Sequence, residues 1–79
     1  MNDNEKILNF LKNNADTKFT ISDIAINTGI YQQRVRSLLP KLLIDNEQLA
    51  ILLHETPLKV MYVESTIKNI SELEGGINT

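Results

Sequence analysis

The apolar positions at the start of the chain repeat with the spacing of a helix. Ile7, Leu8 and Leu11 recur at helical spacing, and polar residues such as Glu5, Lys6 and Asn9 lie around them. This period places their side chains on one face of an amphipathic helix. We expect the helix to begin at Asp3, which can cap its first turn, and to end near Asn13.

A second helix is predicted after a short extended segment. The segment, residues 18–20, is long enough only to add an edge strand to a small sheet. Thr20 is followed three residues later by Asp23, so a hydroxyl and a carboxylate are both available to the free amides of a helix N-terminus. Gly29 is expected to end this helix, because a residue without Cβ adopts the left-handed conformation at no steric cost.

A third helix is predicted from Gln32 onward. Its inward stripe consists of Val35, Leu38, Leu39 and Leu42. Pro40 interrupts the pattern, because it lacks an amide donor and crowds the carbonyl group of Arg36, at a cost of about 3 kcal/mol. We therefore expect a kink at Pro40, with residues 41–45 continuing as a distorted last turn.

Two short apolar runs predict an antiparallel β-hairpin. Residues 49–53 and 60–63 are rich in β-forming side chains, and the polar stretch 54–59 is the loop between them. Both faces of these strands are apolar. The face that carries Leu52, with Met61 or Tyr62 across from it, therefore needs a cover. That cover is the C-terminal segment, a second subunit or a partner protein. The side chains expected to face the core are Leu49, Ile51 and Leu53.

The C-terminal segment predicts a short final helix. Ser65 or Thr66 can cap it, and its apolar residues share one face. These residues extend the candidate partner or dimer surface of the hairpin: Ile67, Ile70 and Leu73. The expected architecture is mainly α with a small antiparallel hairpin, in the order α-β-α-α-β-β plus the C-terminal helix. Residues 1–74 form one domain, and residues 75–79 a frayed tail.

Composition narrows the classes of function. The chain has 79 residues, is 42% hydrophobic, and has two Tyr and two Phe as its aromatic residues. Such a core is too small to enclose a large cofactor. The chain has no Cys and one His, His54, and no Ser has a His and a carboxylate at triad spacing. We therefore expect that the protein is not an enzyme and binds no metal or cofactor. We also expect that it has no membrane span and is cytoplasmic.

The charge is nearly balanced overall but uneven along the chain. Eight basic and ten acidic side chains give a net charge of −2, which disfavours avid, nonspecific binding to duplex DNA. Residues 31–44, however, carry Arg34, Arg36 and Lys41 and no acidic residue. The third predicted helix is therefore locally positive.

The spacing of four residues resembles that of the winged helix-turn-helix family. Ala25, Gly29, Val35 and Leu38 stand where that family keeps small, flexible and buried residues. A small Ala lets two helices approach, Gly permits the turn, and the two apolar residues lock the crossing. The resemblance covers roughly residues 3–64.

The resemblance implies a mode of DNA binding. In the family, the helix that corresponds to the one from Gln32 enters the major groove. The side chains that this places against bases are Gln32, Gln33 and Arg36. Those placed against phosphates are Tyr31, Arg34, Ser37 and Lys41, together with Lys59 on the wing. The alternative for the two Arg and two Gln side chains is an ordinary solvated helix face.

Two functions follow from these patterns. The first is a winged-helix DNA-binding protein, a small transcriptional regulator that acts as a dimer. The alternative is an accessory subunit of a mobile-element replication complex, which docks on a larger protein and assists the binding of single-stranded DNA. In that case Tyr31 and Tyr62 are candidates for stacking on bases. The negative net charge and the two-sided apolar hairpin favour this alternative.

Overall fold

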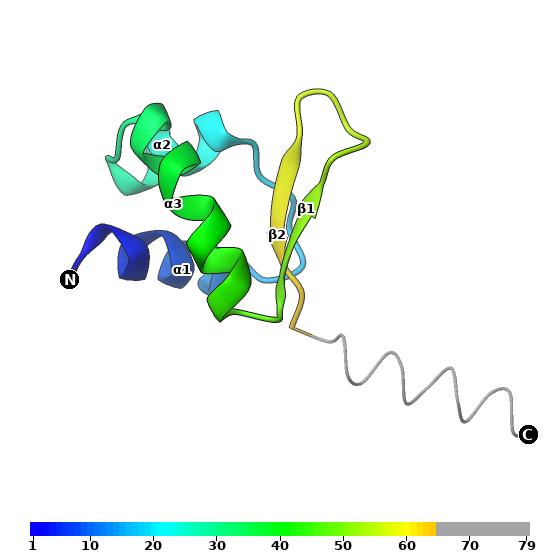
Figure 1. Ribbon diagram of the computed structural model, residues 1–79, viewed down its shortest axis with the longest axis horizontal. Helices are drawn as coiled ribbons and strands as arrows, with labels where there is room; N and C mark the ends of the chain where they lie inside the picture. Colours follow the sequence, from blue (N-terminus) through cyan, green and yellow to red (C-terminus); the bar gives the residue numbers. More distant parts are fainter. Residues whose placement is uncertain (65–79) are drawn as a thin grey trace, which may run out of the picture.

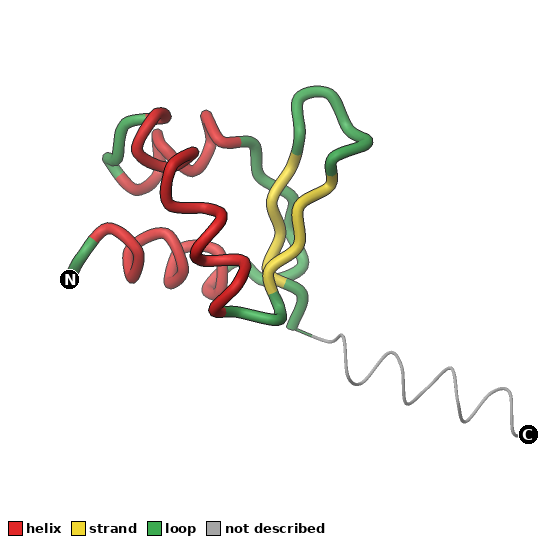
Figure 2. Tube along the Cα trace, in the orientation of Figure 1, coloured by secondary structure: helices red, strands yellow, loops and turns green. Residues whose placement is uncertain are grey.

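The computed structural model describes residues 1–64, which form three helices followed by a two-stranded antiparallel hairpin (Figure 1). Figure 2 shows the helices gathered together, with the hairpin standing beside them and its loop extending away from the strands. The arrangement is mainly α and is compatible with a winged helix-turn-helix. The elements are α1 (Asp3–Asn13), α2 (Ile21–Thr28), α3 (Gln32–Asp45), β1 (Leu49–Leu52) and β2 (Lys59–Tyr62).

The first helix ends where the sequence predicts, but its N-cap is one residue earlier. Asn2, not Asp3, has the extended backbone of a cap residue, and its side-chain oxygen accepts a hydrogen bond from the Glu5 amide at 2.9 Å. Asn and Asp cap helices about equally well, so adjacent Asn and Asp residues do not reveal from sequence which one is the cap. Asp3 lies in the first turn, where its charge favours the helix N-terminus.

The second helix has the predicted capping residues at both ends. The Thr20 hydroxyl accepts a hydrogen bond from the Asp23 amide at 3.0 Å, and the Asp23 carboxylate accepts one from the Thr20 amide at 3.1 Å. Gly29 follows the helix with a φ of 75°, and its amide donates to the Ala25 carbonyl at 2.9 Å. The predicted capping box and the left-handed glycine are therefore confirmed.

The strand predicted at residues 18–20 is not formed. Only Phe19 pairs there, in one antiparallel bridge with Val60 that has N–O distances of 2.9 and 2.7 Å. The bridge cannot lengthen into a strand because Thr20 already caps α2 and helical backbone begins at Ile21. The predicted C-terminal helix falls in residues 65–79, outside the described residues.

The third helix continues through Pro40. It begins at Gln32 as predicted and runs for 14 residues to Asp45. Leu39 and Leu42, on either side of Pro40, are only 3% and 4% exposed. Their burial offsets the cost of about 3 kcal/mol for a proline inside a helix.

One apolar core joins the helices to the hairpin. The largest side chains without exposed surface come from all three helices and from β2: Ile7, Leu11, Ile24, Val35 and Val60. Val35 on α3 has no exposed surface, and α3 packs against α2, as the predicted helix crossing requires. The core therefore fixes how α3 sits relative to α2 and to the β1–β2 hairpin with its loop, which we call the wing.

The register of the hairpin decides which side chains reach the core. Leu49 pairs with Tyr62 and both are buried, whereas Leu52 and Met61 lie on the opposite face and are half-buried. Leu53 was expected to face the core, but it is 77% exposed. Strand pairing ends one residue earlier, and the chain turns away from the core into the loop.

Candidate nucleic-acid interface

The side chains proposed to contact DNA from α3 all lie at the surface. The following side chains are all exposed to solvent: Tyr31, Gln32, Gln33, Arg34, Arg36, Ser37 and Lys41. Because consecutive residues of a helix are turned by about 100°, these side chains do not form one surface. The fold divides them between two flanks and a crest, and each group has different neighbours.

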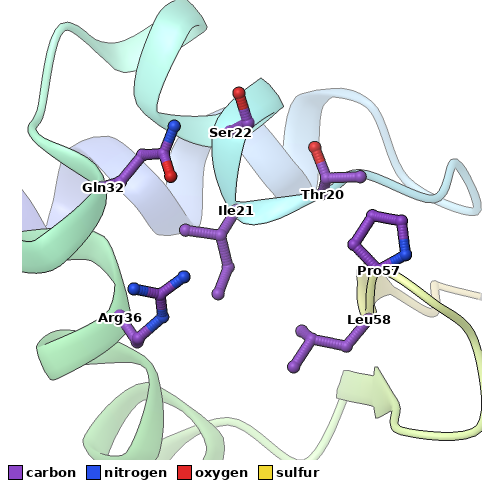
Figure 3. A pocket seen from close by; sticks show the side chains of 7 residues that line it. All are labelled: Thr20, Ile21, Ser22, Gln32, Arg36, Pro57 and Leu58. Carbon is purple, nitrogen blue, oxygen red and sulfur yellow. The ribbon is translucent and has the colours of Figure 1, made fainter.

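One flank of α3 faces the start of α2 and the loop of the wing. Gln32 and Arg36, one turn apart, point into an open pocket of about 260 Å³ (Figure 3). The other residues that line it are Thr20, Ile21 and Ser22 from the start of α2, and Pro57 and Leu58 from the wing. Three of the lining side chains are apolar and four are polar. We call the surface formed by these seven residues the concave face.

Arg34 lies on the other flank of α3. Its Nε atom is 3.1 Å from Oδ2 of Asp3, which ties the start of α3 to α1. The Arg34 side chain remains 57% exposed, so its guanidinium group is paired with Asp3 but is still accessible to solvent. Arg34 and Arg36 are thus separated by the body of the helix. They do not act as a single clamp.

The crest of α3 between these flanks is uncharged in its first two turns. Gln33 and Ser37 are one turn apart there, and the Ser37 hydroxyl donates to the Arg34 carbonyl at 2.8 Å. Lys41 follows one further turn along, and Ile44 near the end of the helix is 82% exposed. The crest therefore offers an amide, a hydroxyl, the Lys41 ammonium and an apolar side chain to a binding partner.

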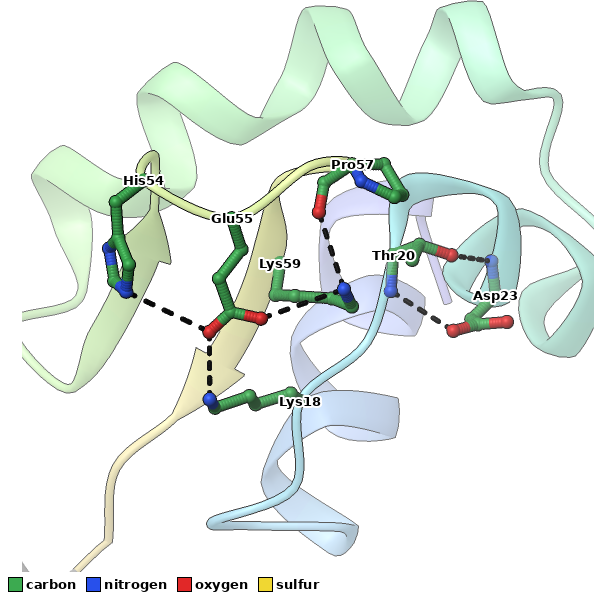
Figure 4. A network of polar contacts seen from close by, with 7 residues as sticks. All are labelled: Lys18, Thr20, Asp23, His54, Glu55, Pro57 and Lys59. Carbon is green, nitrogen blue, oxygen red and sulfur yellow. Dashed lines mark hydrogen bonds and ion pairs between the residues drawn. The ribbon is translucent and has the colours of Figure 1, made fainter.

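A cluster of cations surrounds one carboxylate on the wing (Figure 4). Glu55 lies 2.7 Å from the Lys18 ammonium and 3.6 Å from that of Lys59. His54 Nε2 is 3.9 Å from the same carboxylate. The hydrogen bond from Lys18 lowers the pKa of Glu55, burial of the carboxyl opposes this shift, and the charge of Lys59 adds to it.

In this cluster Lys59, a predicted phosphate contact, already has partners within the protein. Its ammonium group is engaged by Glu55 and also donates to the Pro57 carbonyl at 3.3 Å, and the side chain is only 25% exposed. A phosphate must therefore replace Glu55 before it can pair with Lys59. The role of Lys59 in DNA binding stays a prediction.

The structure adds residues that the sequence did not single out. Ser22 enters the concave face because α2 begins beside the wing, and Lys18 meets Glu55 across 37 positions of sequence. No local pattern signals either contact. The only cue for Ser22 is its place two residues after a predicted helix cap, where side chains lie near free backbone amides.

The candidate partner surface is described only in part. Leu52 and Met61 share the outer face of the hairpin, as predicted, and each is half-buried. The other members, Ile67, Ile70 and Leu73, lie outside the described residues.

Residues 1–64 were searched for clusters of metal-ligating side chains and for helices able to span a membrane. No three His, Asp or Glu side chains in this range gather at a distance that would hold a metal ion. None of the helices in the same range has the length and apolar content of a membrane span. Comparisons of the chain with protein-family models, with curated proteins and with solved structures found no match.

Proposed function

We propose that this chain is a small winged-helix protein that binds duplex DNA and regulates transcription as a dimer. In this proposal α3 lies in the major groove and the β1–β2 hairpin is the wing. The observation that supports it best is the concave face, where Gln32 and Arg36 on α3 stand opposite the wing residue Pro57. Gln pairs well with adenine and Arg with guanine in the major groove.

The dimensions and the charge of α3 suit this role. Fourteen residues make a helix about 21 Å long, and the major groove is about 12 Å wide and admits an α-helix. Asp45, the last residue of α3, is its one acidic residue, so the rest of the helix meets phosphates without like-charge repulsion of its own. The net charge of −2 keeps the affinity of a single domain low. A dimer supplies the missing affinity by binding two half-sites at once.

The two arginines of α3 provide the test, because they carry the same charge on opposite flanks. A duplex selected from a random-sequence pool is titrated with protein and followed by fluorescence anisotropy. Arg36→Ala is expected to cost about 1–3 kcal/mol of binding free energy and to relax the preference for one base pair. Arg34→Ala is the matched control, expected to weaken binding to all sequences alike and by less.

Two results contradict this proposal. The first is no binding to any duplex at low salt. The second is an equal loss of affinity in the Arg34 and Arg36 variants with no change in sequence preference. That outcome would mean that α3 contributes only nonspecific positive charge and reads no bases.

A second candidate function is an accessory subunit that docks on a larger replication protein. It is favoured by large apolar side chains at the surface, since Ile44 on α3 and Leu53 beyond β1 are 82% and 77% exposed. The double variant Ile44→Ser with Leu53→Ser is expected to lose a stoichiometric partner that co-purifies with the wild type from the native host. Co-purification unchanged by both substitutions removes the support for this candidate.

A further inference from the structure

The cluster on the wing has the composition of an anion site that is already filled. Two ammonium groups, from Lys18 and Lys59, approach the two oxygens of one carboxylate, Glu55. The lysines come from separate parts of the chain, one before α2 and one on β2. Glu55 lies in the loop between the strands, so its carboxylate can move away without disturbing strand pairing.

We propose that Lys18 and Lys59 form a phosphate-binding site on the wing, and that the Glu55 carboxylate occupies this site in the free protein as an internal competitor of the DNA backbone. The inference rests on the proposed function, since the phosphate in question belongs to duplex DNA. It assigns Lys18 to the interface and gives Glu55 a role in setting affinity.

The chemistry of the two anions makes the exchange feasible. Carboxylates and phosphates both accept charge-assisted hydrogen bonds from ammonium groups. The Lys18 and Glu55 side chains are 51% and 22% exposed, so solvent screens their pairing and its loss costs the fold little. When the lysines pair with a DNA phosphate, counterions are released from the DNA, and this release favours binding. Pairing with the internal carboxylate releases no such counterions.

The position of the cluster connects it with the concave face. Lys59 donates to the carbonyl of Pro57, and the ring of Pro57 lines the concave face with Arg36. A DNA backbone that passes the wing beside Arg36 therefore comes close to the two lysines. Contacts on α3 and on the wing then belong to one continuous surface.

The test compares two substitutions that remove one negative charge each. Glu55→Gln frees the lysines, whereas Glu47→Gln changes an exposed carboxylate at the other end of the hairpin. Glu55→Gln is expected to bind the same duplex roughly tenfold more tightly at about 50 mM salt. The slope of log affinity against log salt is expected to stay near the wild-type value, because both lysines pair with phosphate in either complex. Glu47→Gln is expected to match the wild type, and Lys18→Gln is expected to remove much of the gain in Glu55→Gln.

Two outcomes overturn the inference while the proposed function stands. The first is that wild-type protein binds duplex DNA and the Glu55 and Glu47 variants bind it with the same affinity. If Glu55→Gln fails to fold, as judged by circular dichroism, the single variants Lys18→Gln and Lys59→Gln decide, and the second outcome is an unchanged salt dependence in both. The inference expects each to flatten the salt dependence by about 1, whereas lysines that only brace the loop leave it unchanged.

A wild-type protein that binds no duplex contradicts the proposed function, and the site is then tested separately with inorganic pyrophosphate. Chemical shifts of the Lys18 and Lys59 amides are followed by NMR. Saturation at a lower pyrophosphate concentration in Glu55→Gln than in Glu47→Gln supports the site. Identical titrations of the two variants overturn it.

Discussion

The turn between α2 and α3 depends on one backbone conformation, so Gly29→Ala isolates its cost. Gly29 has φ 75° and ψ 17°, in the left-handed region. A Cβ added there meets no atom within 4 Å, so no steric clash with the rest of the protein contributes. The remaining cost is that of placing an L-residue in the left-handed conformation, about 1–2 kcal/mol. Alanine also lowers the conformational entropy of the unfolded chain, which offsets part of this cost. The net destabilisation is therefore about 1 kcal/mol.

Urea unfolding followed by circular dichroism at 222 nm measures this cost. For a domain of this size the m-value is about 1 kcal/mol per molar, so the midpoint of Gly29→Ala is expected to fall by about 1 M with an unchanged m-value. Gly29→Asn is the matched control and is expected to lose less, because Asn adopts the left-handed region more readily. A Gly29→Ala variant as stable as the wild type, or one destabilised by 3 kcal/mol or more, would refute the reasoning. The first result denies the left-handed turn, and the second reveals a clash.

Three further predictions concern the cap of α2, the core and the wing. Thr20→Ala removes the hydroxyl that accepts from the Asp23 amide, and it is expected to lower the free energy of unfolding by about 1 kcal/mol in the same urea assay. Val35→Ala removes two methyl groups from a side chain with no exposed surface, for an expected loss of about 2 kcal/mol, and an unchanged midpoint would contradict the packing. The pKa of Glu55 lies below its ordinary value of 4.5, so the stability it contributes is present above pH 4.5 and is lost as the pH falls through the lowered pKa. Glu55→Gln is therefore expected to lose less stability than the wild type between pH 5 and pH 3, and equal losses would contradict the role of the Lys18 pair.

The features that the sequence predicted correctly depend on residues close together in the chain. The capping box joins Thr20 to Asp23 within one turn, and the left-handed glycine needs only its own missing Cβ. The inward stripe of α3 follows from its 3.6-residue period, which places Val35 and Leu39 in the core. These interactions are settled within a few residues, so sequence alone predicts them.

The errors in the predicted fold arise where distant segments compete. Residues 18–20 have the length of an edge strand, but Thr20 is needed as a cap and only Phe19 pairs with β2. The alternation of core-facing and outward-facing side chains predicts Leu53 in the core, but strand pairing stops at Leu52. Where a strand ends is decided by its partner, and that partner is not visible in a local pattern.

The chemistry of the candidate site shows the same division. Arg34 and Arg36 look alike in the sequence, yet one pairs with Asp3 on α1 while the other faces the wing. Lys18 and Glu55 are 37 residues apart and form the shortest ion pair of the wing. Each partner is brought in by packing of the core.

By itself, the amino-acid sequence determined the three helices, the left-handed turn, the hairpin and the positive charge of α3, because propensity, capping and hydrophobic period act over a few residues. Only the tertiary structure decided which flank of α3 meets the wing and which cations are already paired. Packing of the shared core around Val35 and Val60 sets the relative positions of the elements. Ionic contacts depend on distances of a few ångströms across that packing, and the order of residues along the chain does not specify them.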